Sequence, residues 1–449
     1  MQLVAYGAQD VYLTGNAQIT FFKTVYRRHT NFAMEMIDQV FTGGRADFGQ
    51  KVSCTVARNG DLMHRVFLRA TLPRVTVSAA EDGADAQARW VEEVGHALIK
   101  CVTLEIGGQT IDKQYGEWLC IYNELTLPAG KRAGYDAMIG NVPELTELKR
   151  VPVAVGSEGG CCDDGATCTP DDGSCAPAYT VYVPLQFYFC RNAGLALPLI
   201  ALQYHEVKLQ VELTELKKLL WSNAPSVRAR AAAAGLLDAA LMVEYVYLDT
   251  YERRRMAQAS HEYLIEQVQF SGADSTGAVA KRVALSLNHP VKELVWVAQR
   301  ADYTGCDGGS EAAAHGGPQP FNFSDAWVQD VEDGGRGGVN PVARAKLQLN
   351  GHDRFAEADG AFFSLVQPYM HHTNVPARRR GINVYSFALK PEEHQPSGSC
   401  NFSRLDSAVL VLQLTPRAVA GTEVLIRVYA VTYNVLRCME GMAGLAYSN

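Results

Sequence analysis

The chain has 449 residues, which suits two domains of roughly 200 residues better than one core. Its 41 Lys and Arg residues against 48 Asp and Glu residues give a formal net charge of -7, which argues against a chain-wide basic surface for nucleic acid. The first residues lack the charged and apolar regions of a signal peptide, so we expect a soluble chain made in the cytosol.

Strand patterns dominate the first half of the chain. Residues 66–68 and 104–106 are short apolar runs beside turn residues, and residues 207–214 alternate apolar with polar side chains. That alternation is typical of a sheet with one face in water. Another strand is expected at 241–248.

Few helices are expected. The clearest covers residues 250–258, where Thr250 can act as the N-cap and Glu252 lies in the first turn against the helix dipole. This short helix falls at the junction between the two halves of the chain.

Three blocks of the first half recur in the second half in the same order. The pairs are residues 59–68 with 288–297, 104–118 with 347–362, and 188–214 with 385–415. Self-similarity at this long period predicts two copies of one domain instead of a solenoid of short repeats. Because short strands bounded by turn residues fill both copies, we predict an all-β chain of two tandem sandwiches joined by the short helix.

Three stretches lack strand periodicity and are predicted to be long loops. They are the Gly, Asp and Cys-rich residues 155–178, the Ala and Arg-rich residues 222–240, and the Gly-rich residues 304–339.

Cys161, Cys162, Cys168 and Cys175 gather in the first of these loops, beside four aspartates. Disulfides, a metal site and free thiols are all open readings. Paired Cys-x-x-Cys knuckles are missing and the aspartates lack the terminal Glu of a calcium loop, so no metal or other cofactor is predicted. Five other cysteines in or beside apolar runs are expected to pack as small hydrophobes: Cys54, Cys101, Cys120, Cys190 and Cys438.

Asn322 begins an N-glycosylation sequon in the third loop, and a glycan there is a hypothesis that requires an exposed loop. Asn401 begins a second sequon just before a strand, where a structural role is expected. The arginine runs 253–255 and 378–380 are predicted to pair with carboxylates at interfaces in preference to phosphate.

The sequence contains no catalytic constellation. His371, His372 and the scattered other histidines do not form the closely spaced His-x-His plus Glu set of a cupin metal site. Nucleophile-elbow and His-Glu-x-x-His motifs are also absent, so we predict a protein that is not an enzyme. A carbohydrate-binding jelly-roll protein remains an alternative, because loop Tyr and Trp side chains could stack on sugars.

Five segments carry a resemblance to a known family. They are residues 5–32, 104–123, 197–207, 248–255 and 381–406, the last of which reads GINVYSFALKPEEHQPSGSCNFSRLD. Together they resemble the double jelly-roll major capsid proteins of nucleocytoplasmic large DNA viruses, of the algal phycodnavirus and iridovirus kind. These blocks span most of the chain, so the match is specific.

The resemblance implies an N-terminal segment at residues 1–24 on the inner face of a capsid, followed by two eight-stranded antiparallel jelly rolls at 25–250 and 251–449. It further implies that three chains form a homotrimeric, pseudo-sixfold capsomer, which tiles an icosahedral shell with neighbouring capsomers, penton proteins and minor capsid proteins. Minor proteins would connect the shell to an inner membrane, and no direct contact with nucleic acid is expected. Such a chain would be made and assembled in the host cytoplasm and reside in the virion shell. A minor capsid paralogue of the same fold is the alternative.

Overall fold

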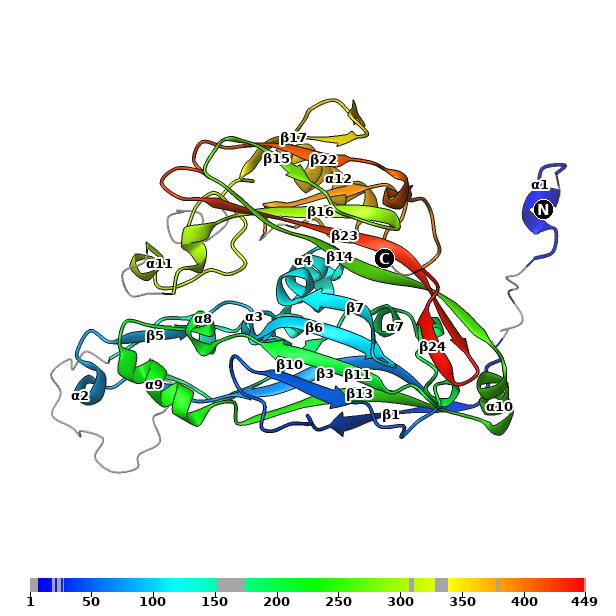
Figure 1. The fold of residues 1–449 in the computed structure, drawn as a ribbon, viewed down its shortest axis with the longest axis horizontal. Helices are drawn as coiled ribbons and strands as arrows, with labels where there is room; N and C mark the ends of the chain where they lie inside the picture. The colour runs from blue at the N-terminus through cyan, green and yellow to red at the C-terminus, as the bar shows by residue number, and fades with distance from the viewer. Residues whose placement is uncertain are drawn as a thin grey trace, which may run out of the picture.

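Two β-sheet halves are stacked in the computed structural model, which describes residues 7–17, 21, 26, 28–151, 174–306, 311–327, 338–376 and 379–447 (Figure 1). Helix α4 (Gly116–Thr126) lies between the halves. Helix α1 (Asp10–Thr14) lies apart from both of them, and none of its residues is buried.

The first half has eight principal strands in two antiparallel sheets. One sheet has the order β1 (Phe32–Gln39), β13 (Asp238–Leu248), β3 (Leu62–Leu72), β10 (Tyr179–Pro184). The other has the order β2 (Lys51–Thr55), β11 (Val207–Leu213), β6 (Ile99–Ile106), β7 (Gln109–Tyr115). Short strands add two small sheets: β12 (Leu220–Ser222) with β5 (Gln87–Trp90) and β8 (Lys149–Arg150), and β4 (Val75–Thr76) with β9 (Cys175–Ala176).

Strand β11 shows why the predicted alternation produces a sheet of this kind. Val207, Leu209, Val211 and Leu213 are buried in the core of the first half, while the polar residues between them are half-buried on the other face. A period of two places every second side chain on one face of a strand, so the sequence pattern fixes which face meets the core.

The second half repeats the same arrangement. One sheet has the order β14 (His261–Thr276), β23 (Val424–Met439), β16 (Pro290–Arg300), β20 (Ile382–Ser386), and the other has the order β15 (Ala280–Ala284), β22 (Ala408–Leu414), β17 (Val342–Leu349), β18 (His352–Asp353). Three short strands flank them: β19 (Ala358–Asp359), β21 (Cys400–Asn401) and β24 (Met442–Leu445).

The blocks that recur in the sequence occupy equivalent strands in the two halves. Residues 66–68 lie in β3 and 294–297 in β16, at the same place in the strand order. The other pairs fall in β6 and β17, and in β11 and β22. The prediction of two tandem eight-stranded antiparallel jelly rolls is thereby confirmed.

Helix α10 (Thr250–Gln258) connects the halves over the predicted residues, but its cap differs from the prediction. The side chain of Asp249 accepts a hydrogen bond from the Glu252 backbone N–H at 2.9 Å, which makes Asp249 the N-cap and Thr250 the first helical residue. Both residue types can cap a helix, so the local sequence leaves this one-residue choice open.

The last hairpin of the second half, β23 with β24, reaches down to the first half (Figure 1). Leu436, Cys438 and Ala443 from this hairpin belong to the hydrophobic core of the first half. The backbone N–H of Ala443 donates to Nδ1 of His205 at 3.2 Å. The two halves are therefore joined by packing as well as by α10.

The fold contains more helix than the sequence predicted. Helix α9 (Pro225–Ala234) forms inside the stretch 222–240 that was predicted to be a loop, because an Ala and Arg-rich run has high helix propensity. The remaining α-helices are short: α2 (Ala79–Asp82), α3 (Val94–Leu98), α5 (Arg132–Met138), α6 (Pro143–Thr146), α7 (Tyr188–Arg191), α8 (Leu216–Leu219), α11 (Glu311–Ala314) and α12 (Gln367–His371). Among the described residues, the helices are too short or too polar to span a membrane.

Candidate functional site

The joint between the two halves is built around α4. Trp118, Ile121 and Leu125 of this helix are almost completely buried against the outer face of the β14-β23-β16-β20 sheet. The Trp118 ring lies 5.5 Å from the ring of Tyr429, measured between centroids. Large aromatic surfaces contribute most of the energy of such joints, so Trp118 is its main apolar anchor.

Polar contacts of the joint lie beside Trp118 on the same helix. Glu117 accepts a hydrogen bond from the Tyr429 hydroxyl at 2.5 Å and forms an ion pair with Arg427. Burial and the neighbouring Glu117 carboxylate raise the pKa of Tyr429 well above its usual value, which keeps the phenol protonated as a donor.

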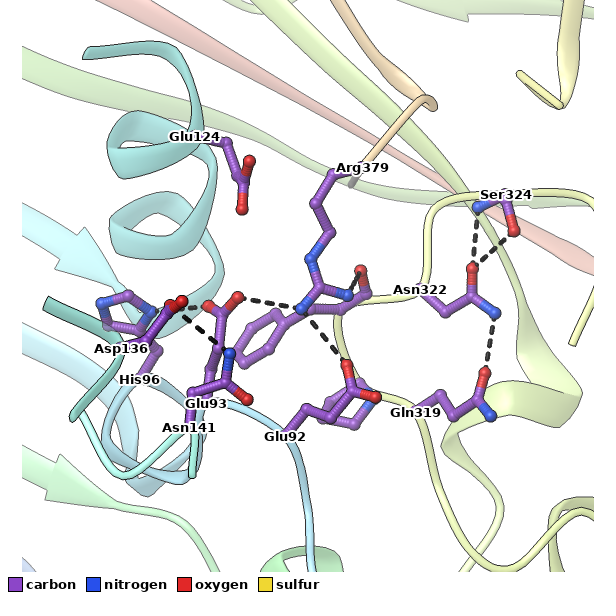
Figure 2. A network of polar contacts seen from close by, with 12 residues as sticks. Glu92, Glu93, His96, Glu124, Asp136, Asn141, Gln319, Asn322, Ser324 and Arg379 are labelled. Carbon is purple, nitrogen blue, oxygen red and sulfur yellow. Dashed lines mark hydrogen bonds and ion pairs between the residues drawn. The ribbon is translucent and has the colours of Figure 1, made fainter. Parts of the chain in front are cut away.

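Arg379 provides a further charged contact across the joint (Figure 2). Its guanidinium lies 2.9 Å from Glu93 and 3.6 Å from Glu92, both of the first half, and it donates to the Phe321 carbonyl oxygen at 2.6 Å. The Arg379 and Glu93 side chains are only 9% and 4% exposed. Burial opposes ionisation of Glu93, but Arg379 and His96 outweigh it and lower its pKa. Arg379 of the run 378–380 therefore pairs with carboxylates within one chain, and pairing of the run across an interface stays a prediction.

The backbone around Glu93 is held in an unusual conformation. Its φ of 50° lies in the left-handed region, which non-glycine residues adopt at an energetic cost. Glu93 is the N-cap of α3 (Val94–Leu98), and its carboxylate points toward Arg379 and His96.

Glu93, His96 and Cys120 bring three metal-ligand atoms within 4.8 Å of one another. His96 Nδ1 lies 3.0 Å from Glu93, and its Nε2 lies 2.7 Å from the Tyr135 hydroxyl. Burial and the nearby Glu93 carboxylate raise the pKa of the Cys120 thiol well above its usual value, so it stays protonated. Arg379 pairs with Glu93 in the same cluster, so this carboxylate already has a cationic partner within the chain.

A second buried ionic cluster links the same two halves. Arg191 of α7 lies 2.8 Å from Glu266 of β14, and Lys292 of β16 lies 2.6 Å from the other oxygen of that carboxylate. Within the second half, the imidazole of His372 lies between Glu293, at 3.2 Å, and Glu392, at 3.1 Å. Burial opposes protonation of His372, but the two carboxylates outweigh it and raise its pKa to about 9.

Of the residues predicted as sites from sequence, Cys175 and Asn322 are described by the structure, and neither belongs to these clusters. Cys161, Cys162 and Cys168 lie outside the described residues, whereas Cys175 is a buried free thiol that accepts a hydrogen bond from Arg74 Nε at 3.0 Å. A disulfide loop at these cysteines stays a prediction. The five cysteines predicted to pack are free thiols, four of them buried and Cys190 half-buried.

Asn322 is only 5% exposed, and its amide is engaged on both sides (Figure 2). Its Nδ2 donates to Gln319 Oε1 at 2.8 Å and to the Ala326 carbonyl oxygen at 2.9 Å, while its Oδ1 accepts from Ser324 Oγ at 2.7 Å. Glycosylation needs an accessible amide nitrogen. The glycan at Asn322 therefore stays an untested hypothesis, and the folded geometry does not favour it.

Glu117 and Trp118 lie in a block that the sequence analysis singled out, but the charged pair of the joint has little local signal. Glu93 and Arg379 are far apart in the chain, and neither lies in a motif with chemical meaning. The one partial signal was the arginine run itself. His372, which the sequence analysis considered against a cupin metal set, is buried between two carboxylates.

Two family models together match most of the chain. The model described as the major capsid protein N-terminus matches residues 20–249, and the one described as the large eukaryotic DNA virus major capsid protein matches residues 252–444.

Individual relatives agree with this match over the full length. The major capsid proteins of Phaeocystis pouchetii virus and Paramecium bursaria Chlorella virus 1 are 46% and 40% identical, each covering 100% of this chain and 99% of the relative. A chain of the quasi-atomic capsid model of the latter virus, called PBCV-1 there, has a TM-score of 0.69 at 36% identity, covering 96% of this chain and 100% of its own. The Faustovirus major capsid protein has a TM-score of 0.72 at 14% identity, with 97% and 94% covered, which is a likeness of fold alone.

Proposed function

Since the chain belongs to the family of large eukaryotic DNA virus major capsid proteins, a structural and non-enzymatic component of the virion shell, we propose that three copies form a pseudo-sixfold capsomer. Capsomers of this kind would tile an icosahedral shell together with penton and minor capsid proteins. Assembly would take place in the host cytoplasm.

The duplication of the sandwich is the observation that carries this proposal. Each chain offers two eight-stranded sandwiches with the same strand order, joined by buried contacts of α4, Arg379 and the β23-β24 hairpin. A closed ring of three such chains presents six similar edges, which is what a position in a hexagonal lattice requires. The buried contacts inside each chain would keep those edges at fixed angles.

We also propose a division of the chain into residues 1–24, 25–250 and 251–449. The first strand of the first sandwich begins at Phe32 and the connecting helix begins at Thr250, which supports these boundaries. The N-terminal segment would face the inside of the shell, toward minor capsid proteins and an inner membrane.

Electron microscopy of the purified protein tests the proposal. Class averages with a hexagonal outline and three-fold symmetry are the expected result. Particles with the outline of one or two sandwiches, at concentrations of several micromolar, would contradict it.

A further inference from the structure

Each half carries a helix that begins at an equivalent glycine. Helix α4 begins at Gly116 after β7, while the π-helix η7 (Phe362–Val366) and the following α12 begin after Gly360 and β19. A Cβ atom on Gly116 would lie 2.1 Å from the Ile99 carbonyl oxygen, and one on Gly360 would lie 1.9 Å from the Val342 carbonyl oxygen. Both helices therefore start from the same close approach to a neighbouring strand.

The two helices differ in what covers them. Leu365, Val366, Tyr369 and Met370 on the second helix are 47%, 43%, 79% and 51% exposed. Spacings of one, four and five residues place these four side chains along one side of the helix, here named the helix stripe. At the corresponding positions of α4, Ile121 and Leu125 are at most 1% exposed.

An apolar groove continues the helix stripe. It has a volume of about 810 Å³ and is lined by Leu365, Ala361, Val339 and Val342 among others. Contiguous exposed apolar surface of this kind marks sites of protein contact.

The sheet that receives α4 also has an equivalent in the first half. In the second half, Val295 pairs with Tyr429 and Val384, and all three lie under α4. In the first half, Phe67 pairs in the same way with Met242 and Pro184. The outer faces of the two sheets therefore correspond strand by strand.

The equivalent face of the first half carries exposed and half-buried apolar side chains together with the charged residues Arg65, Arg69 and Glu244. Ile382 is fully buried in the joint, whereas Tyr182, at the equivalent ladder position, is 37% exposed, and Met36 on β1 is 39% exposed. We name Met36, Phe67, Tyr182 and Met242 the sheet patch. Arg69 on this face is paired with Asp38 at 2.7 Å and Asp238 at 2.9 Å, whereas the exposed Arg65 lies on the same face of β3 at the edge of the apolar residues.

We propose that the helix stripe of one copy docks on the sheet patch of a second copy, as α4 docks on the second half of its own chain. This inference rests on the homotrimer proposed above and names its contact surface. Because the stripe and the patch are different surfaces, the contact is heterologous. Repeated from copy to copy, it generates a closed ring when the rotation between neighbours brings the last copy back to the first. Three joints within chains and three between chains would then alternate around the capsomer.

Three matched Tyr→Asp substitutions test the surface. Tyr369→Asp places a charge in the stripe, Tyr182→Asp places one in the patch, and Tyr251→Asp on the exposed side of α10 is the control. Light scattering at equal concentration is expected to give three chains for the wild type and Tyr251→Asp, and single chains for the other two. Circular dichroism melting curves check that each variant folds, and Met36→Lys tests the patch if Tyr182→Asp does not fold.

Mixing the two dissociated variants tests the heterologous geometry. An equimolar mixture of Tyr369→Asp and Tyr182→Asp retains one intact stripe and one intact patch, so a species of two chains is expected. A contact between two stripes or between two patches would leave one single variant assembled, and that result would overturn the proposal.

The same data separate this inference from the proposed trimer. A wild type that stays a single chain would contradict both. A wild type of three chains with Tyr369→Asp and Tyr182→Asp also at three chains would leave the trimer standing and reject the docking surface.

Discussion

Arg379 and Glu93 place one buried charge from each half in the joint. Removing one partner leaves the other charge buried and unpaired, so Arg379→Ala is expected to lower the free energy of unfolding by about 3–5 kcal/mol. Urea titration followed by circular dichroism measures this loss. The control is Lys390→Ala, whose exposed ion pair with Glu393 is screened by water, and little change is expected there. Equal losses in both variants would contradict the role given to the buried pair.

His372 makes stability depend on pH in a defined direction. Its pKa is raised from an unfolded value of about 6.5 to about 9, because Glu293 and Glu392 outweigh the effect of burial. The stabilisation is fully present below pH 6.5 and is lost as the pH rises through 9. The free energy of unfolding is therefore expected to fall by up to about 3 kcal/mol across this window, at about 1.4 kcal/mol per pKa unit.

Denaturant titrations between pH 6 and 10 measure this fall. His372→Gln is expected to flatten the pH profile, whereas His371→Gln, whose Nδ1 lies 3.0 Å from the Leu389 carbonyl oxygen, is expected to retain it. A profile unchanged by His372→Gln would assign the pH dependence to other groups.

Asn322 holds its loop by hydrogen bonds from a buried amide. Asn322→Ala leaves partner groups unsatisfied and is expected to destabilise the fold by about 1–3 kcal/mol. Asn401→Ala, at the exposed second sequon, is expected to have a smaller effect.

Peptide masses of the protein made in its host cell are expected to show no added hexose at Asn322, and a glycan there would mean modification before folding.

At the scale of elements, α4 decides how the two halves are oriented. Trp118→Ala removes the main apolar anchor of this helix and leaves a cavity, so a loss of about 3–5 kcal/mol is expected. Tyr251→Ala on the exposed face of α10 provides a control with an expected change within about 0.5 kcal/mol. Thermal unfolding by calorimetry compares the two. A minor effect of Trp118→Ala would show that the joint does not depend on α4.

The strands were more predictable than the helices, for a physical reason. Strand β11 has one face toward water, so its sequence alternates between apolar and polar residues. This alternation predicts a strand. Helix α4 is buried on both sides, since Leu119 packs into the core of the first half and Trp118 into the joint. A helix without a polar face has no amphipathic pattern to detect, which is why it was missed.

The joint itself could not be predicted from local sequence. Its charged pair combines Glu93 with Arg379, and its second cluster combines Arg191 with Glu266, so each pair forms only after the two halves pack. What the sequence did contain was the long-period repeat, and this repeat predicted the two sandwiches correctly. The resemblance supplied the family, which composition and periodicity alone did not.

At the scale of the whole molecule, the two repeated halves differ in one helix. Helix α4 of the first half is covered within the chain, whereas the equivalent helix of the second half, η7 with α12, is exposed along its stripe. A chain needs this difference if similar helix-on-sheet contacts are to form alternately inside one subunit and between neighbouring subunits. Obligate assemblies usually bury large apolar surfaces, in agreement with the apolar character of the stripe, the groove and the patch.

The mass of the wild-type protein in solution tests the central claim most directly. Light scattering coupled to size-exclusion chromatography is expected to give three times the chain mass of 49.0 kDa over a wide range of concentrations. A well-folded species with the mass of one chain across that range would contradict the trimeric capsomer.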